Sequence, residues 1–420
     1  MYKISRLKNG IRVVTENIDY VKSVSAGVWI GAGSAMETLQ NNGASHYIEH
    51  MLFKGTRMRS ASQIAKEMDS VGGQLNAVTS KEYTCYYVKV MTEHLELAFD
   101  VLADMITNST FTEENIETER KVICEEISMC DDTPEDFIHD NLSRIMWQGD
   151  ALGFPIAGTE ETLNGITRDT LLGYKDSFYC AENMVISVVG NFDEKKILEV
   201  LEEKFGGISE KVKTPYNQKK IEVKSGIDIA GKDIEQCHMC LGLEGYPKGD
   251  DRLYDLLVMN AVLGGNMSSR LFQKVREELG LAYSIYSYAN TYRKNGSMVI
   301  YAGLNSGRLL DALKTIGVEI ELLKKEKLSD EEINISKQQM KASVIMGLES
   351  ISSRMSSYGK SILFEDEIKS VEETIKRIES VSRESVAEVI DSVFDKAKLN
   401  IAVCGRITAS KEDVLDALSF

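Results

Sequence analysis

Residues 167–190 and 382–405 are two copies of one pattern. The first, "TRDTLLGYKDSFYCAENMVISVVG", aligns without a gap with the second, "SRESVAEVIDSVFDKAKLNIAVCG", at an offset of 215. Each begins with a helix N-cap residue, Thr167 or Ser382, continues as an amphipathic helix and ends in an apolar strand closed by glycine. "FTEENI" (111–116) and "LSDEEI" (328–333) match in the same way at an offset of 217. The chain is therefore a duplication.

The repeat defines the expected domains, residues 1–212 and 226–420. The seam between them falls in a polar, lysine-rich stretch, 209–226, which holds one of only four prolines. Strand and helix patterns are interspersed in each half, and residues 282–304 have the pattern of an antiparallel hairpin. We therefore predict an α+β fold, in which each domain has a mixed, largely antiparallel sheet covered by helices.

Composition and charge narrow the function classes. The chain has 420 residues and no run of about 18 apolar residues, so no membrane span is expected. It starts with a strand-like pattern and lacks the features of a signal or transit peptide, which predicts a cytoplasmic protein or a mature chain whose signal has been removed. The net charge of −16 argues against a nucleic-acid partner, and it either serves solubility or attracts basic ligands.

The cysteines favour reduced thiols. There are seven, an odd number in a long chain. Cys237 and Cys240 form a C-x-x-C pair, but their segment resembles a buried strand and no second pair follows at zinc-finger spacing. We expect packing in the core rather than a redox or zinc site. Thiol-dependent metal retention would indicate the alternative, a thiol or metal-binding module.

The stretch "HYIEHMLFKGT" (46–56) contains two of only five histidines. The pattern predicts a helix over residues 42–53, which places His46, Glu49 and His50 on one face. Two imidazoles one turn apart can bind a single Zn²⁺, and the glutamate between them can hold a water molecule. A helix with a polar surface stripe would have the same residues, so this motif alone leaves both interpretations open.

A catalytic zinc needs a third protein ligand. The other histidines are scattered, and a carboxylate from the acidic helix predicted over 112–129 is the better candidate. Glu119 and Glu126 are two turns apart and share a face with Val122 and Ile123, which we expect to point inward. A buried carboxylate needs a partner, and a metal is one such partner. A solvated acidic face explains the earlier glutamates of this helix better than it explains Glu126.

Three segments together resemble the successive signatures of the pitrilysin-type metallopeptidases. They are "HYIEHMLFKGT", which has the inverted zincin motif H-x-x-E-H, "GGQLNAVTSKEYTCYY" (72–87) and "ERKVICEEI" (119–127). The family includes insulin-degrading enzyme and the mitochondrial processing peptidase. The chain looks most like the catalytic β subunit of the latter and its bacterial relatives. The segment 263–287 extends the resemblance into the second half.

The resemblance implies one zinc ion per chain, bound by His46, His50 and Glu126. Glu125 points about 100° away from Glu126 around the helix and is not expected to bind. The resemblance further assigns roles to residues that are not ligands, namely Glu49 as general base, Glu119 as a carboxylate that orients a ligand, Arg276 and Tyr283 as donors to the oxyanion, and Asn76 and Ala77 as contacts to the substrate backbone.

The function implied is that of a zinc-dependent endopeptidase, which holds peptides or unfolded segments as an added β-strand in a closed chamber. The second half has no expected metal site, because Glu119 and Glu126 correspond there to Ser336 and Ser343. We expect a homodimer that prefers basic, unfolded peptides. The alternative is a non-catalytic scaffold or regulatory subunit, a class that has lost metal ligands, whereas the motif here is complete.

Overall fold

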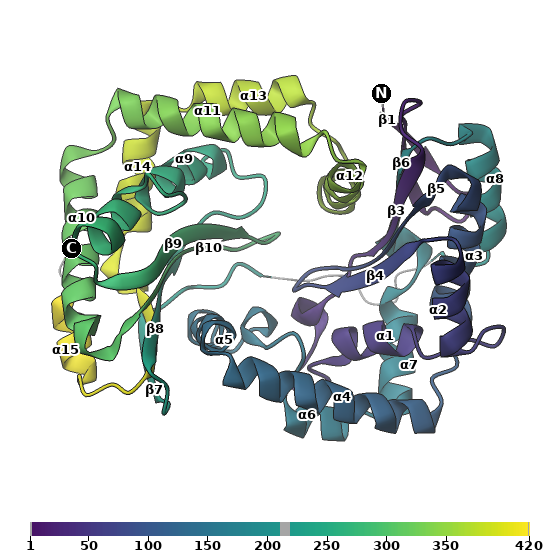
Figure 1. Ribbon diagram of the computed structural model, residues 1–420, viewed down its shortest axis with the longest axis horizontal. Coiled ribbons are helices and arrows are strands. Elements are labelled where there is room, and N and C mark those ends of the chain that lie inside the picture. Colours follow the sequence, from purple (N-terminus) through teal and green to yellow (C-terminus); the bar gives the residue numbers. More distant parts are fainter. Residues whose placement is uncertain (1, 211–218, 419) are drawn as a thin grey trace. The chain divides into compact units, whose positions relative to one another are not determined.

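The computed structural model describes residues 2–210, 219–418 and 420, and its two compact units are each built on one sheet (Figure 1). The predicted seam, 209–226, lies partly outside the described residues. Among those residues, no helix is long and apolar enough to cross a membrane. Unit 1 comprises Met1–Ser128, Phe154–Asn217 and Ile345–Lys369, and unit 2 comprises Met129–Gly153, Gln218–Val344 and Ser370–Phe420.

Unit 1 contains a six-stranded sheet with the order β1-β2-β6-β3-β5-β4. Only the β2–β6 pair is parallel, so the sheet is mixed and largely antiparallel, as predicted. The strands are β1 Tyr2–Arg6, β2 Arg12–Asn17, β3 Ser23–Ile30, β4 Gln74–Thr79, β5 Thr84–Met91 and β6 Met184–Gly190. The helices in the first half of the chain are α1 Ala44–Leu52, α2 Ala61–Ser70, α3 Leu95–Asn108, α4 Glu113–Asp132, α5 Pro134–Met146, α6 Glu160–Gly165, α7 Arg168–Phe178 and α8 Glu194–Phe205.

Unit 2 contains a five-stranded sheet with the order β7-β11-β8-β10-β9, in which only β7–β11 is parallel. The predicted hairpin over 282–304 is confirmed as β9 and β10. The strands are β7 Gly226–Gly231, β8 Gln236–Glu244, β9 Ala282–Thr291, β10 Gly296–Asn305 and β11 Asn400–Gly405. The helices in the second half of the chain are α9 Leu253–Leu263, α10 Leu309–Glu326, α11 Asp330–Gly347, α12 Ile351–Glu365, α13 Val371–Ser380, α14 Arg383–Val393 and α15 Lys411–Ala417.

The predicted duplication is visible in both units. The order β7-β11-β8-β10-β9 repeats the order β2-β6-β3-β5-β4. The aligned segments form α7 followed by β6 in one unit and α14 followed by β11 in the other. Thr167 and Ser382 are the N-caps of these helices, and each takes part in a reciprocal capping box.

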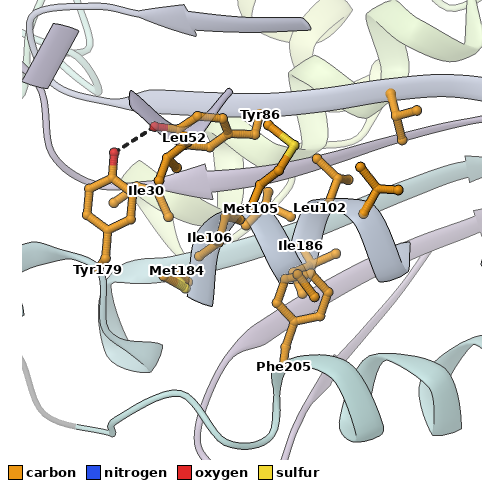
Figure 2. Close-up of a cluster of buried hydrophobic side chains, with 14 of the residues drawn as sticks. Ile30, Leu52, Tyr86, Leu102, Met105, Ile106, Tyr179, Met184, Ile186 and Phe205 are labelled. Carbon is orange, nitrogen blue, oxygen red and sulfur yellow. Dashed lines mark hydrogen bonds between the residues drawn. The ribbon is translucent and has the colours of Figure 1, made fainter. Parts of the chain in front are cut away.

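One face of the unit 1 sheet packs against helices α1, α3, α4, α7 and α8. Alternate strand residues point to this face, which is the period of two expected for a β-strand. Figure 2 shows part of the cluster, where Leu102 and Met105 of α3 lie near Tyr86 of β5 and Phe205 of α8. The hydroxyls of Tyr86 and Tyr179 are hydrogen-bonded at 2.8 Å, so these two buried polar atoms satisfy each other.

The opposite face of each sheet is covered by a helix from the other half of the chain. Helix α12 packs on β3 and β6 in unit 1, and α5 packs on β8 and β11 in unit 2. The ranges 1–212 and 226–420 describe the sequence repeat and stay a prediction. The compact units differ from those ranges because α12 belongs to unit 1 and α5 belongs to unit 2.

Candidate metal centre and active site

Helix α1 carries the H-x-x-E-H motif and spans Ala44–Leu52, inside the predicted range 42–53. It begins after Gly43, which has a φ of 97°, and a Cβ there would lie 2.7 Å from the carbonyl oxygen of Ala157. Tyr47, Ile48 and Met51 are buried in the core, which leaves the motif residues on another face of the helix. The apolar positions thus fix which way the motif points.

A buried carboxylate, Glu37, binds the N-terminus of α1. Its Oε1 accepts a hydrogen bond from Ser45 N at 2.8 Å, and its Oε2 accepts from Gly43 N at 2.8 Å and Asn42 Nδ2 at 2.9 Å. The first backbone N–H groups of a helix have no partner within the helix, and a carboxylate there also complements the helix dipole. Burial raises the pKa of Glu37, which these hydrogen bonds partly oppose. No pattern in the sequence predicted this role for Glu37.

Helix α4 supplies the acidic residues and is anchored to α1 by a hydrogen bond from Tyr47 OH to the carbonyl of Ile116. Ile123 is fully buried, as predicted, but the inward orientation predicted for Val122 is wrong, because its side chain is 41% exposed. Glu119 and Glu126 flank Ile123 at −4 and +3, whereas Val122 lies about 100° further around the helix. Glu125 is exposed.

His46, His50 and Glu126 each offer a ligand atom, and these atoms lie within 4.8 Å of one another. Glu126 Oε2 is 3.7 Å from His46 Nε2 and 3.4 Å from His50 Nε2. Zinc with metal–ligand bonds of about 2.0–2.2 Å in a tetrahedron requires ligand separations of roughly 3.3–3.6 Å. Two imidazole nitrogens and one carboxylate oxygen at these separations fit a zinc ion with an open fourth position.

The protonation of His46 suits metal binding. Burial, with a smaller contribution from the charge of nearby His50, lowers the pKa of His46 to about 4. The imidazole is therefore neutral at pH 7, which is the form that binds metals.

Glu49 lies beside the three candidate ligands and is not one of them. Burial raises the pKa of its carboxylate, opposed by a hydrogen bond from Thr79 Oγ1 to Glu49 Oε2. Thr79 is the last residue of β4, so the end of this strand orients the glutamate. A carboxylate with a raised pKa is a stronger base than an exposed one. Thr79 is a second residue that the sequence analysis did not identify.

Glu119 contacts a candidate ligand without being one. Its Oε2 is 3.1 Å from His50 Nδ1, and its Oε1 is 2.8 Å from Lys54 Nζ. The predicted orienting carboxylate therefore lies next to the nitrogen of His50 that faces away from Glu126. Lys54, in the "HMLFKGT" ending, was not singled out by the sequence analysis.

Strand β4 forms one edge of the unit 1 sheet and contacts α1. Asn76 and Ala77 lie in the middle of this strand and pair on one side with β5. Asn76 is exposed, and its side-chain oxygen accepts a hydrogen bond from Ala77 N at 2.8 Å. The outer side of the strand has no pairing strand among the described residues, which is the geometry needed to add a further strand.

Arg276 and Tyr283 belong to unit 2, and the structure brings them together. Arg276 lies in a seven-residue π-helix, Phe272–Glu278, and its guanidinium is 4.7 Å from the ring centre of Phe272 and 5.8 Å from that of Tyr283. Tyr283, near the start of β9, is 77% exposed. The arginine can thus hold the tyrosine ring by a cation–π contact while the hydroxyl stays accessible.

Cys237 and Cys240 are both buried on β8, as predicted from their apolar segment. Residues three apart on a strand point to opposite faces. Cys237 faces the core of unit 2, and Cys240 Sγ lies 3.5 Å from His139 Nδ1 of α5. The two thiols therefore do not form a local chelating pair.

Comparisons with known proteins agree with this geometry. Residues 12–160 match the family described as insulinase (peptidase family M16), and residues 165–340 match the peptidase M16 inactive domain. A protein named uncharacterized zinc protease YmxG, from Bacillus subtilis, is 45% identical over 394 residues, covering 94% of this chain and 96% of that one. Another protein named as a zinc protease, from Streptomyces coelicolor, is 39% identical, with 93% of this chain and 86% of that one covered.

A crystal structure of a protease from Helicobacter pylori has the same fold, with a TM-score of 0.91 at 20% identity, covering 96% of this chain and 99% of that one. The family predicted from the sequence motifs is confirmed by the family matches and by the relatives that span nearly the whole chain. This protein belongs to the insulinase family of peptidases, peptidase family M16.

Proposed function

We propose that this protein is a zinc-dependent endopeptidase whose metal centre is formed by His46, His50 and Glu126. The observation that carries the proposal is the convergence of their three ligand atoms beside Glu49, a half-buried carboxylate that is not a ligand. Peptidases of this chemistry need three protein ligands, an open position and a separate base, and all of these are supplied by α1 and α4.

The chemistry divides between the metal and the protein. A bound zinc ion would polarise the scissile carbonyl and lower the pKa of a water molecule towards neutrality. Glu49 would accept a proton from the attacking water and return it to the leaving amine. Thr79 holds one oxygen of Glu49 by a hydrogen bond and so limits the orientations of the carboxylate.

We further propose that the substrate adds as a strand to the free edge of β4, with its backbone against Asn76 and Ala77. This mode tolerates many sequences, since main-chain groups supply most of the hydrogen bonds. The net charge of −16 favours basic, unfolded peptides, and their binding should weaken as salt is added. A homodimer and a cytoplasmic location are parts of the same proposal.

Two variants test the proposal with purified protein. Glu126→Gln should weaken zinc binding far more than Glu125→Gln, because Glu126 Oε2 lies near both imidazoles and Glu125 is exposed. Glu49→Gln should retain zinc and fold but lose peptidase activity by several orders of magnitude, because both proton transfers depend on it. Equal zinc loss in the first pair, or nearly full activity in Glu49→Gln, would overturn the assignment.

The same experiment separates the enzyme from the second candidate, a non-catalytic subunit. The observation that favours catalysis is the presence of the base beside a full set of three ligands. A scaffold would bind peptides without cleaving them, and Glu49→Gln would then leave every measured property unchanged.

A further inference from the structure

Three side chains form a continuous line of contacts that ends at a candidate zinc ligand. Lys54 Nζ is 2.8 Å from Glu119 Oε1, and Glu119 Oε2 is 3.1 Å from His50 Nδ1. His50 Nε2 in turn lies 3.4 Å from Glu126 Oε2, within the metal centre. The side chain of Glu119 is only 3% exposed, whereas that of Lys54 is 36% exposed. The line therefore runs from the protein surface inward to the metal site.

We infer that Lys54 is a positioning residue of the metal centre. By holding one oxygen of Glu119, it keeps the other oxygen on the Nδ1–H of His50, so that the Nε2 lone pair points at the metal. This inference rests on the zinc centre proposed above and adds a residue to it.

Glu119 is a buried carboxylate, and each of its two oxygens has a partner. The terminal torsion of a glutamate side chain is broad, so one hydrogen bond alone orients the group weakly. A buried carboxylate with a lost partner is also costly, and the group then shifts toward whatever water or donor remains. Lys54 occupies Oε1, which leaves Oε2 for His50.

The position of Lys54 is itself fixed. Its carbonyl oxygen accepts a hydrogen bond from Asn115 Nδ2 of α4 at 2.9 Å, and its amide donates to Met51 O of α1 at 3.1 Å. The lysine thus bridges the helix that carries the histidines and the helix that carries Glu126. These bonds fix the backbone of Lys54, and the ion pair with Glu119 sets the direction of its side chain.

The two candidate histidine ligands differ in whether their Nδ1 atom contacts another side chain. His46 Nδ1 is buried and has no hydrogen-bond partner in the part of the chain that the structure describes. His50 is the ligand whose ring is oriented by a carboxylate, and outer partners of this kind set the tautomer and the ring orientation of a metal-binding histidine. Loss of Lys54 should therefore act on zinc affinity through His50.

The test measures zinc affinity of the full chain by competition with a chelator. Lys54→Met keeps the aliphatic stem and removes the ammonium, and should weaken zinc binding about 10-fold, the lower end of the effect of removing an outer partner. Lys54→Arg retains a cation that can reach Glu119 and should recover most of the affinity. The matched control is Lys204→Met, since Lys204 Nζ is 2.8 Å from Asp100 in the same unit, is 29% exposed and contacts none of the metal-centre residues.

A double-mutant cycle tests whether Lys54 acts on zinc binding through Glu119. In a Glu119→Gln background, Lys54→Met should weaken zinc binding by less than about twofold, because the group through which it acts has already been changed. A full 10-fold loss in that background would show that Lys54 acts independently of Glu119 and would overturn the inference. If Lys204→Met weakened zinc binding as much as Lys54→Met, the cause would be a general loss of stability, and the inference would also be overturned.

The outcomes also separate this inference from the function on which it rests. Wild-type protein that binds no zinc would overturn the metal centre and the role of Lys54 together. If wild type binds zinc and Glu126→Gln loses it, while Lys54→Met keeps the wild-type affinity, only the inference about Lys54 fails.

Discussion

The backbone of Gly359 packs directly on the indole ring of Trp29. A Cβ at Gly359 would lie 2.1 Å from Trp29 Nε1, closer than any real contact allows. The indole cannot move aside easily, because it is buried and its Nε1 donates a hydrogen bond to Ser187 Oγ at 2.8 Å. Gly27, on the same strand as Trp29, leaves similar room for Met355, since a Cβ there would lie 2.6 Å from its sulfur. Small residues on both sides thus allow α12 to dock on the sheet of unit 1.

The first prediction concerns this docking. Gly359→Ala should lower the free energy of unfolding by about 1–3 kcal/mol, the usual cost of overpacking a core, because α12 must shift off β3. The measurement is chemical unfolding of the full chain, followed by circular dichroism. Gly173→Ala in α7 is the matched control, since no atom lies within 4 Å of the added methyl group. That control should stabilise the protein by roughly 0.5–1 kcal/mol. Equal effects of the two substitutions would show that the close contact between Gly359 and Trp29 does not affect the free energy of unfolding.

The second prediction concerns the N-terminus of α1. Glu37→Ala removes the acceptor for Gly43 N, Ser45 N and Asn42 Nδ2 and leaves buried donors without a partner. It should cost at least about 2 kcal/mol of folding free energy, since each orphaned buried donor costs roughly 1–3 kcal/mol. Glu37→Gln retains one acceptor oxygen and should lose less. A change below about 0.5 kcal/mol for Glu37→Ala in urea unfolding would contradict the capping role.

The residues of the metal centre were predictable where the geometry is local. The spacing of His46, Glu49 and His50 places them on one helix face regardless of the rest of the fold. The two-turn separation of Glu119 and Glu126 is local in the same sense. The prediction failed at Val122, because an i+3 position lies at the border of a helix face and its burial depends on what packs beside it.

The residues that support the centre were missed because no pattern along the sequence predicts their contacts. Glu37 binds the start of a helix, Thr79 reaches Glu49 from a strand, and Lys54 pairs with Glu119 of another helix. None of these pairs follows a periodic spacing of residues that would predict the contact. The docking of α12 on the first sheet was missed for the same reason, since an exchange of helices between repeats leaves the pattern of each repeat unchanged.

The third prediction concerns pH in the metal-free protein. The pKa of His46 is lowered by burial, and then by the charge of His50, from 6.5 to about 4. The folded state thus binds this proton less readily than the unfolded chain. The contribution of this pKa difference to the free energy of unfolding is fully present above about pH 6.5 and is lost as the pH falls towards 4. The shift corresponds to roughly 3 kcal/mol.

Urea unfolding of the metal-free protein at pH 7, 5.5 and 4 measures this effect. The free energy of unfolding of wild type should fall by roughly 3 kcal/mol more across this range than that of His46→Gln, which has no imidazole to protonate. His94→Gln removes a histidine outside the centre and should follow the wild-type profile. Parallel profiles for wild type and His46→Gln would refute the assignment of the shift to His46.

The last prediction concerns Arg276 and Tyr283, whose role we propose from their match to the family motif. If Tyr283 donates to the oxyanion, Tyr283→Phe should lower kcat by roughly 10²–10³, as found for loss of one oxyanion donor. Zinc content should not change, because Tyr283 is not a ligand, and the retained ring still contacts the guanidinium of Arg276, 5.8 Å from its centre. Tyr20→Phe is the matched control, because Tyr20 is also 77% exposed and belongs to no candidate site. Arg276→Ala should reduce kcat further, since it removes both a positive charge and the group that holds the Tyr283 ring. Wild-type kcat in Tyr283→Phe, with the control equally active, would exclude the tyrosine from the mechanism and leave the acceleration to the metal centre and Glu49.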